Sequence, residues 1–117
     1  MMRWLSVTAC IALGSGCAGA PPVPAQRFTD AETEINAAQQ LGAGNSPQGK
    51  LHLQQARDQL DAAKRLSKDE PAVAARKLDN AQAEAALAKS LTREQATRAE
   101  ADEAKAKLSA LGTGGGR

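Results

Sequence analysis

The chain has 117 residues, 24% of them charged, and a formal net charge of +2. This length allows one small domain, and the nearly balanced charge argues against a dedicated nucleic-acid-binding protein. Hydrophobic residues make up 42% of the chain, but about half of these are alanine, which favours helix and buries little surface. With one Phe, one Trp and no Tyr, the sequence lacks the aromatic residues typical of sheets. We expect an all-α protein without a deep pocket.

Residues 1–16 have the features of an export signal. Arg3 supplies a positive charge, and an apolar stretch of about ten residues runs from Trp4 to Leu13. A membrane-spanning helix needs about 20 apolar residues, so this stretch is too short to be one. We therefore predict a signal peptide.

The segment Leu13-Gly14-Ser15-Gly16-Cys17 resembles the lipobox of bacterial lipoproteins, in which the cysteine is acylated and becomes the first residue of the mature chain. It departs from that motif because Leu13 lies four positions before the cysteine, where the motif has leucine three before. The segment that ends at Cys10 fits the motif better, but a cut there leaves too short an apolar core. An ordinary signal-peptidase cut after Ala20 would place Pro21 next, where proline is poorly tolerated. We predict lipidation of Cys17, and the alternative is a Cys10–Cys17 disulfide or two buried thiols in an uncleaved segment.

Lipidation would anchor the chain to a membrane without a spanning helix, because three acyl chains hold far more strongly than one. Ala18 follows Cys17 at the position where inner-membrane lipoproteins often carry Asp. This resemblance to enterobacterial sorting signals implies an outer-membrane lipoprotein that faces the periplasm.

An extended tether and a first helix are expected next. Residues 17–24 comprise the lipidated cysteine and a segment with three prolines, which cannot be helical before its last member. The helix begins at Pro24 or at Thr29, where Thr29-Asp30-Ala31-Glu32 has the form of a capping box. It ends near Leu41, and its apolar residues recur at helical spacing: Phe28, Ala31, Ile35, Ala38 and Leu41.

A second helix is predicted after the break at residues 42–45, with Ser46 as N-cap and Pro47 as its first residue. Its apolar stripe is Leu53, Ala56, Leu60 and Ala63, flanked by Leu66. The segment Ser67–Pro71 ends this helix and starts the next one. Because this connection is short, the third helix must run antiparallel to the second.

The third helix is predicted from Ala72 to about Leu111, a length of about 60 Å. Leu78, Ala81, Ala85 and Ala88, with Leu87 and Leu91 beside them, are expected to pack on the earlier helices. Beyond Thr92 the apolar face weakens, so this part either projects as a solvated helix or pairs with another copy. Gly112 is expected to cap the helix. Residues 25–111 thus form an antiparallel helical hairpin or three-helix arrangement, and residues 112–117 form a flexible tail.

The spacing of small and apolar residues resembles the domain of unknown function 4398 family, whose members are Ala-rich helical domains of bacterial envelope lipoproteins. The chain departs from the family at Ser46-Pro47, where Ala-Pro is common, and in having no OmpA-like domain after it. The resemblance therefore implies an envelope lipoprotein but neither peptidoglycan binding nor a reaction. It covers nearly all of the mature chain and rests on Ala31-x3-Ile35-x2-Ala38, Gly42-Ala43, Pro47-x3-Leu51, Ala56-x3-Leu60-x2-Ala63 and Ala75-x5-Ala81-x3-Ala85-x2-Ala88.

The sequence predicts no catalytic residue, no cofactor, no metal site and no small-molecule substrate. His52 is the only histidine and is expected to be solvated or at the edge of a groove. Asp58 and Asp61 share one helical face, but little apolar surface surrounds them, so they are expected to be ordinary surface carboxylates. The basic residues near the second connection are diluted by acidic ones, and no aromatic residues accompany them for nucleic-acid stacking. These basic residues are Lys64, Arg65, Lys68, Arg76 and Lys77.

Small side chains on the second and third helices are candidates for binding a partner helix, although internal packing explains them as well. We expect a lipid-anchored periplasmic helical scaffold or interaction protein whose partner is another envelope protein. The alternatives are a peptide-binding assembly factor of an outer-membrane complex and a self-associating coiled-coil spacer. The candidate partner-binding residues are Leu53, Ala56, Leu60, Ala81, Ala85 and Ala88.

Overall fold

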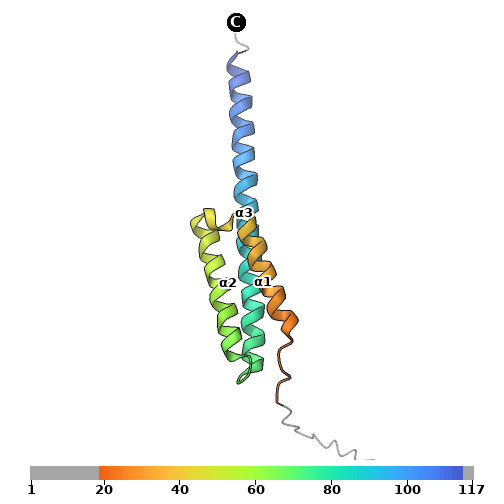
Figure 1. Cartoon of the computed structure of the whole chain (residues 1–117). Coiled ribbons are helices and arrows are strands. Elements are labelled where there is room, and N and C mark those ends of the chain that lie inside the picture. The colour runs from red at the N-terminus through yellow and green to blue at the C-terminus, as the bar shows by residue number, and fades with distance from the viewer. Residues whose placement is uncertain (1–18, 115–117) are drawn as a thin grey trace, which may run out of the picture.

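A computed structural model describes residues 19–114 of the chain as three α-helices and one short 3₁₀ turn (Figure 1). The elements are α1 (Ala25–Gln40), η1 (Ala43–Asn45), α2 (Pro47–Leu66) and α3 (Pro71–Gly114). The predicted all-α class, with three helices and a long C-terminal one, is confirmed. The predicted signal peptide and Cys17 lie outside the described residues. Within residues 19–114, no helix combines the length and the apolar character needed to cross a membrane.

Proline and serine set the helix starts as the sequence predicts. Pro24 is the N-cap of α1, so the helix begins at the first of the two expected positions and the capping box at Thr29 does not form. The Thr29 hydroxyl instead lies 3.5 Å from the Ala25 carbonyl inside the helix. At α2, the Ser46 side chain accepts a hydrogen bond of 3.1 Å from the Gly49 amide, which satisfies one of the free N–H groups of the first turn.

The three helices pack side by side, with α2 antiparallel to α1 and α3 (Figure 1). The order of the ion pairs between α1 and α3 shows that these two helices run in the same direction. Arg27 of α1 pairs with Asp79 of α3, and Glu34 pairs with Lys89 farther along both helices. The chain therefore enters the bundle at the end that carries the α2–α3 connection, and α3 leaves the bundle at the opposite end.

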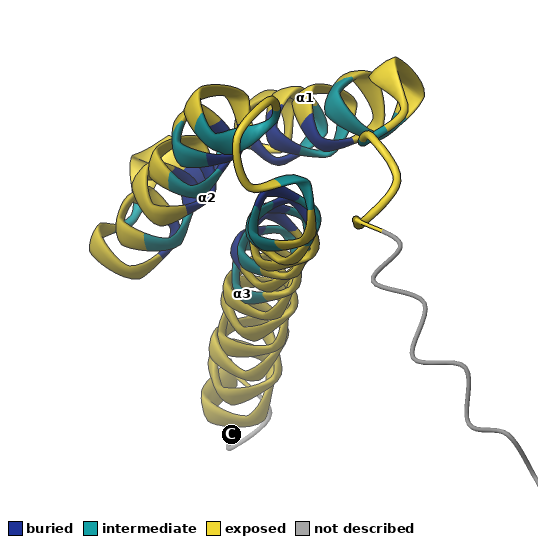
Figure 2. Cartoon of the chain, turned by 90° about the horizontal axis from the view of Figure 1, so that it is seen from below, coloured by how far each residue is buried: buried dark blue, intermediate teal, exposed yellow. Residues whose placement is uncertain are grey.

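Alanine dominates the core. Nine of the thirteen buried hydrophobic residues are alanine, and the larger ones are Ile35, Leu53, Leu60 and Leu78. Figure 2 shows the buried residues on the sides of the helices that face one another. Since an alanine side chain is one methyl group, the core is thin and its stability depends on close packing. The buried alanines are Ala31, Ala38, Ala43, Ala56, Ala63, Ala74, Ala81, Ala85 and Ala88.

The last residues of the extended segment 19–24 pack against this core. Val23 precedes the N-cap and Phe28 is the fourth residue of α1, the positions of a hydrophobic staple. Both side chains are partly buried against the core cluster. The staple fixes the direction in which the chain enters α1.

Two expectations about α3 are wrong. Leu87, expected in the packed face, is 42% exposed because it lies well around the helix from the buried stripe. Gly112, expected to end the helix, is helical, and α3 continues to Gly114. Gly42 is the only glycine with positive φ in residues 19–114, so Gly112 does not adopt the left-handed cap. The Thr113 hydroxyl donates to the Ser109 carbonyl at 2.9 Å within the continued helix.

Gly49 is the position in α2 where a side chain fits least. A Cβ atom there would lie 2.3 Å from the Ala43 carbonyl oxygen and 2.9 Å from the Ser46 hydroxyl. We expect Gly49→Ala to lower the free energy of unfolding by about 1–3 kcal/mol, because overpacking against backbone outweighs the helix propensity of alanine. Thermal or urea unfolding measures the change. Gly44→Ala is the control, because nothing lies within 4 Å of the added atom, and equal losses in both variants would contradict the close approach.

Candidate functional site

The six residues predicted to bind a partner all lie in the core. Leu53 and Leu60 are 4% and 6% exposed, and Ala56, Ala81, Ala85 and Ala88 are fully buried. The structure brings them together across the α2–α3 contact, where their small size allows the helices to approach. None of them is accessible to a partner in this arrangement. Internal packing is therefore a sufficient explanation of the alanine pattern.

Polar contacts between helices surround the core. On the α1–α3 side these are the Arg27–Asp79 and Lys89–Glu34 ion pairs. On the α1–α2 side, Lys64 Nζ lies 2.7 Å from Glu32 Oε1, and Arg57 donates a hydrogen bond of 2.7 Å to Gln39 Oε1. These charged and polar pairs join residues of different helices around the alanine core.

His52 belongs to the same set of contacts. Its Nδ1 lies 2.7 Å from Glu84 Oε2, and the two side chains are only 23% and 31% exposed. An ionised carboxylate has no hydrogen to donate, so Nδ1–H of His52 is the donor. His52 therefore links α2 to α3 at the rim of the core, with part of its side chain exposed. No local sequence pattern predicts this pair, because its members are 32 residues apart.

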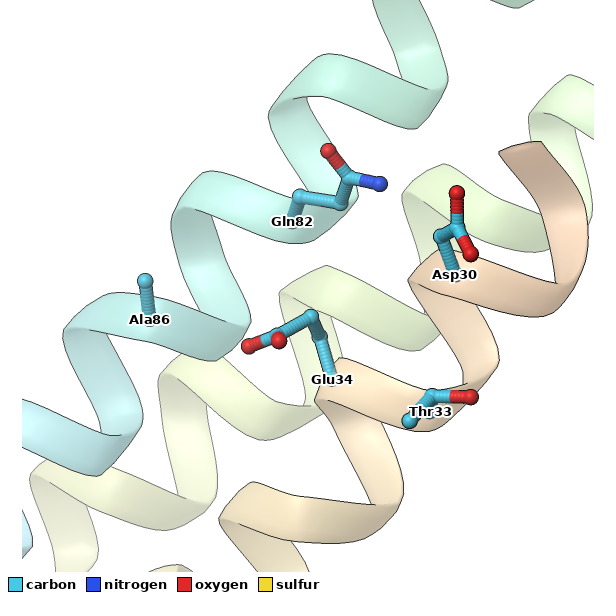
Figure 3. Close-up of a pocket in the computed structure, with 5 residues that line it drawn as sticks. All are labelled: Asp30, Thr33, Glu34, Gln82 and Ala86. Carbon is cyan, nitrogen blue, oxygen red and sulfur yellow. The ribbon is translucent and has the colours of Figure 1, made fainter. Parts of the chain in front are cut away.

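The grooves between helices are open and polar. One groove lies between α1 and α3, where Figure 3 shows Gln82 pointing toward Asp30. Its two carboxylates already have partners: Asp30 accepts a hydrogen bond of 2.8 Å from Gln26, and Glu34 pairs with Lys89. Four of the five side chains that line this groove are polar or charged. The residues that line it are Asp30, Thr33, Glu34, Gln82 and Ala86.

The second groove, between α1 and α2, is also lined mainly by polar and charged side chains. Asp61 lies in it, whereas Asp58 accepts a hydrogen bond of 2.9 Å from Gln54 on the surface of α2. The two aspartates do not form a joint site. Within residues 19–114, no group of three or more His, Cys, Asp or Glu side chains is placed to hold a metal ion.

The basic residues of the α2–α3 connection lie at the end of the bundle where the tether enters (Figure 1). Acidic side chains balance them: Lys64 pairs with Glu32, and Asp69 and Glu70 lie in the connection itself. This end of the bundle therefore carries no strong positive patch.

The C-terminal half of α3 is the one long surface without contacts in the described part of the chain. Residues 93–114, which we call the arm, are all exposed, and Figure 1 shows them extending beyond α1 and α2. Residues 71–92 are the base of α3. The ion pairs of the arm are internal to the helix and join Glu94 to Arg98, Asp102 to Lys105 and Glu103 to Lys107.

Comparisons with family models, curated proteins and solved structures found no match to the chain. The resemblance to the domain of unknown function 4398 family remains a prediction. The functional argument therefore rests on the residues themselves.

A size change at the α2–α3 contact tests the packing. Ala85 is fully buried and Ala106 is exposed on the arm, and alanine and leucine have similar helix propensities. We expect Ala85→Leu to lower the free energy of unfolding by about 1–3 kcal/mol because the longer side chain separates the helices. Ala106→Leu should change it by less than about 0.5 kcal/mol. Equal effects in urea unfolding would show that the contact is not close.

Proposed function

We propose that this chain is a lipid-anchored helical scaffold of the bacterial cell envelope, held at the outer membrane through Cys17 and facing the periplasm. In this role it performs no catalysis, and it presents its arm at a set distance from the membrane. The observation that carries the proposal is the position of the tether relative to the arm. The chain enters the bundle at one end and the arm leaves it at the other (Figure 1).

The N-terminal sequence supports the anchor. Arg3, the apolar run after it and the small residues before Cys17 form the order of features that exported lipoproteins carry. Only five residues lie between Cys17 and Val23, which packs against the core. Fully extended, the chain from Cys17 to Val23 spans about 20 Å. An acyl chain on Cys17 would therefore keep the bundle close to the membrane surface.

The length of α3 supports the scaffold role. Its 44 residues extend over about 66 Å, and the arm accounts for about half of this length. The bundle buries its alanine stripes internally and its grooves are polar, so the arm is the largest surface left for another protein. The peptide-binding alternative has less support, since the residues it would use are buried.

Substitution of the cysteines tests the anchor. We expect Cys17→Ala to abolish incorporation of radiolabelled palmitate and to move the chain from the membrane to the soluble fraction. Cys10→Ala is the matched control and should keep both the label and the membrane fraction, because Cys10 would be removed with the signal peptide. Label that persists in Cys17→Ala and is lost in Cys10→Ala would show that the other cysteine is acylated. Absence of label from the parent chain would overturn the anchor.

A further inference from the structure

The arm carries an apolar stripe that nothing covers. Leu108 and Leu111 are 69% and 75% exposed, the highest values among the large hydrophobic residues of the described chain. Ala101 and Ala104 precede them at spacings of three and four, so all four side chains share one face of the helix. We call Ala101, Ala104, Leu108 and Leu111 the arm stripe.

The arm stripe is not a continuation of the core. The buried residues of the base are Ala74, Leu78, Ala81, Ala85 and Ala88. At 100° per residue, this face continues into the arm through Ala96, Ala99, Glu103, Ala106 and Ala110. The arm stripe lies about 140° around α3 from this face. It therefore lies outside the face that packs on α1 and α2, and it holds both leucines of the arm.

We infer that the arm stripe binds the arm stripe of a second copy of this chain, in parallel, when both copies are anchored in one membrane. This inference rests on the lipid anchor proposed above. In a parallel two-stranded coiled coil, Ala101 and Leu108 take the a positions and Ala104 and Leu111 take the d positions. Each residue of the stripe then packs against its own counterpart, as a two-fold axis requires.

The charges beside the arm stripe favour the parallel direction. Glu100 is at a g position and Lys105 at the following e position, so parallel pairing brings Glu100 of each copy to Lys105 of the other. Arg93 and Arg98 also approach across the pair, but Arg98 is already paired with Glu94 of its own helix. The antiparallel register that aligns the whole stripe, Ala101 with Leu111 and Ala104 with Leu108, instead brings Lys105 and Lys107 each opposite its own counterpart.

Anchoring in a membrane strengthens the association that the short arm stripe gives. Two alanines and two leucines in a helix of this length give weak association in dilute solution. Anchoring confines the copies to one surface, which raises their effective concentration to the millimolar order. Because the tether enters the bundle at the end opposite the arm, anchored copies also point their arms the same way. The pair therefore forms on the membrane and dissociates when the chain is released from it.

Disulfide trapping in intact cells tests this inference with the full chain. The variants carry Cys10→Ala, so that after acylation of Cys17 the introduced cysteine is the only free thiol. We expect oxidation to trap Leu108→Cys as a disulfide-linked dimer, and Leu111→Cys likewise. Ala106→Cys is the matched control, because residue 106 lies on the opposite side of the arm, and it should give several-fold less dimer. Equal trapping at 106 and 108, or a mixed disulfide with another protein in place of the dimer, would overturn the inference.

Two further variants test the contribution of the Glu100–Lys105 pair to the dimer. Glu100→Lys should reduce trapping of Leu108→Cys, and adding Lys105→Glu should restore it, because the pair is then reversed rather than broken. Failure of the second change to restore the dimer would contradict the parallel register. Palmitate labelling of the same cells distinguishes the two proposals: labelled chain that gives no dimer overturns the pairing alone, whereas unlabelled chain overturns the anchor and the pairing that depends on it.

Discussion

Close packing of alanine faces is the constraint on which this structure depends. Nine of thirteen buried hydrophobic residues have a single methyl group as side chain. Burial of large apolar groups therefore contributes little to the stability of the fold, and short contact distances between the helices contribute much. Leu78 is the one large side chain with no exposed surface in the described part of the chain. The core therefore needs the surrounding contacts between helices, Arg27–Asp79, Lys64–Glu32 and His52–Glu84 among them, to hold its register.

The same constraint divides α3 into two parts with different chemistry. In the base, buried alanines face α1 and α2, and the charged side chains make pairs with other helices. In the arm, the charged side chains pair within the helix, which stabilises an exposed helix without a neighbour. The division falls near Thr92, at the end of the bundle where α1 ends and α2 begins. A thin bundle thus serves as a support from which a long, polar helix with one apolar stripe projects.

Much of the fold could be predicted from the sequence. Ser46 and Pro47 mark the start of α2 without ambiguity, and the stripe from Leu53 to Ala63 identifies its buried face. The end of α3 could not be predicted, because Gly112 is compatible with either a left-handed cap or a continued helix. The close approach of Gly49 to Ala43 could not be predicted either, since it depends on how the chain turns at residues 42–45.

The candidate site was harder to predict than the fold. Periodicity identifies faces of small apolar residues, but it does not show whether such a face packs within the chain or binds a partner. The six residues predicted to bind a partner are buried inside the bundle. Leu87 and Leu108 follow similar local patterns, yet only the position of α1 and α2 shows which surface is free. His52 and Glu84 meet only because the antiparallel connection sets residues 32 positions apart side by side.

Amide hydrogen exchange of the chain tests the division of α3 most directly. Amides of the core positions in α2 and the base, such as Leu60, Leu78 and Ala85, should exchange slowest and at one common rate, since they open only when the bundle unfolds. Amides of residues 93–114 should exchange much faster, at rates that decrease steadily from the tip toward the base. Uniform slow exchange along the whole of α3 would contradict the account, because it would mean that the arm is part of the folded core.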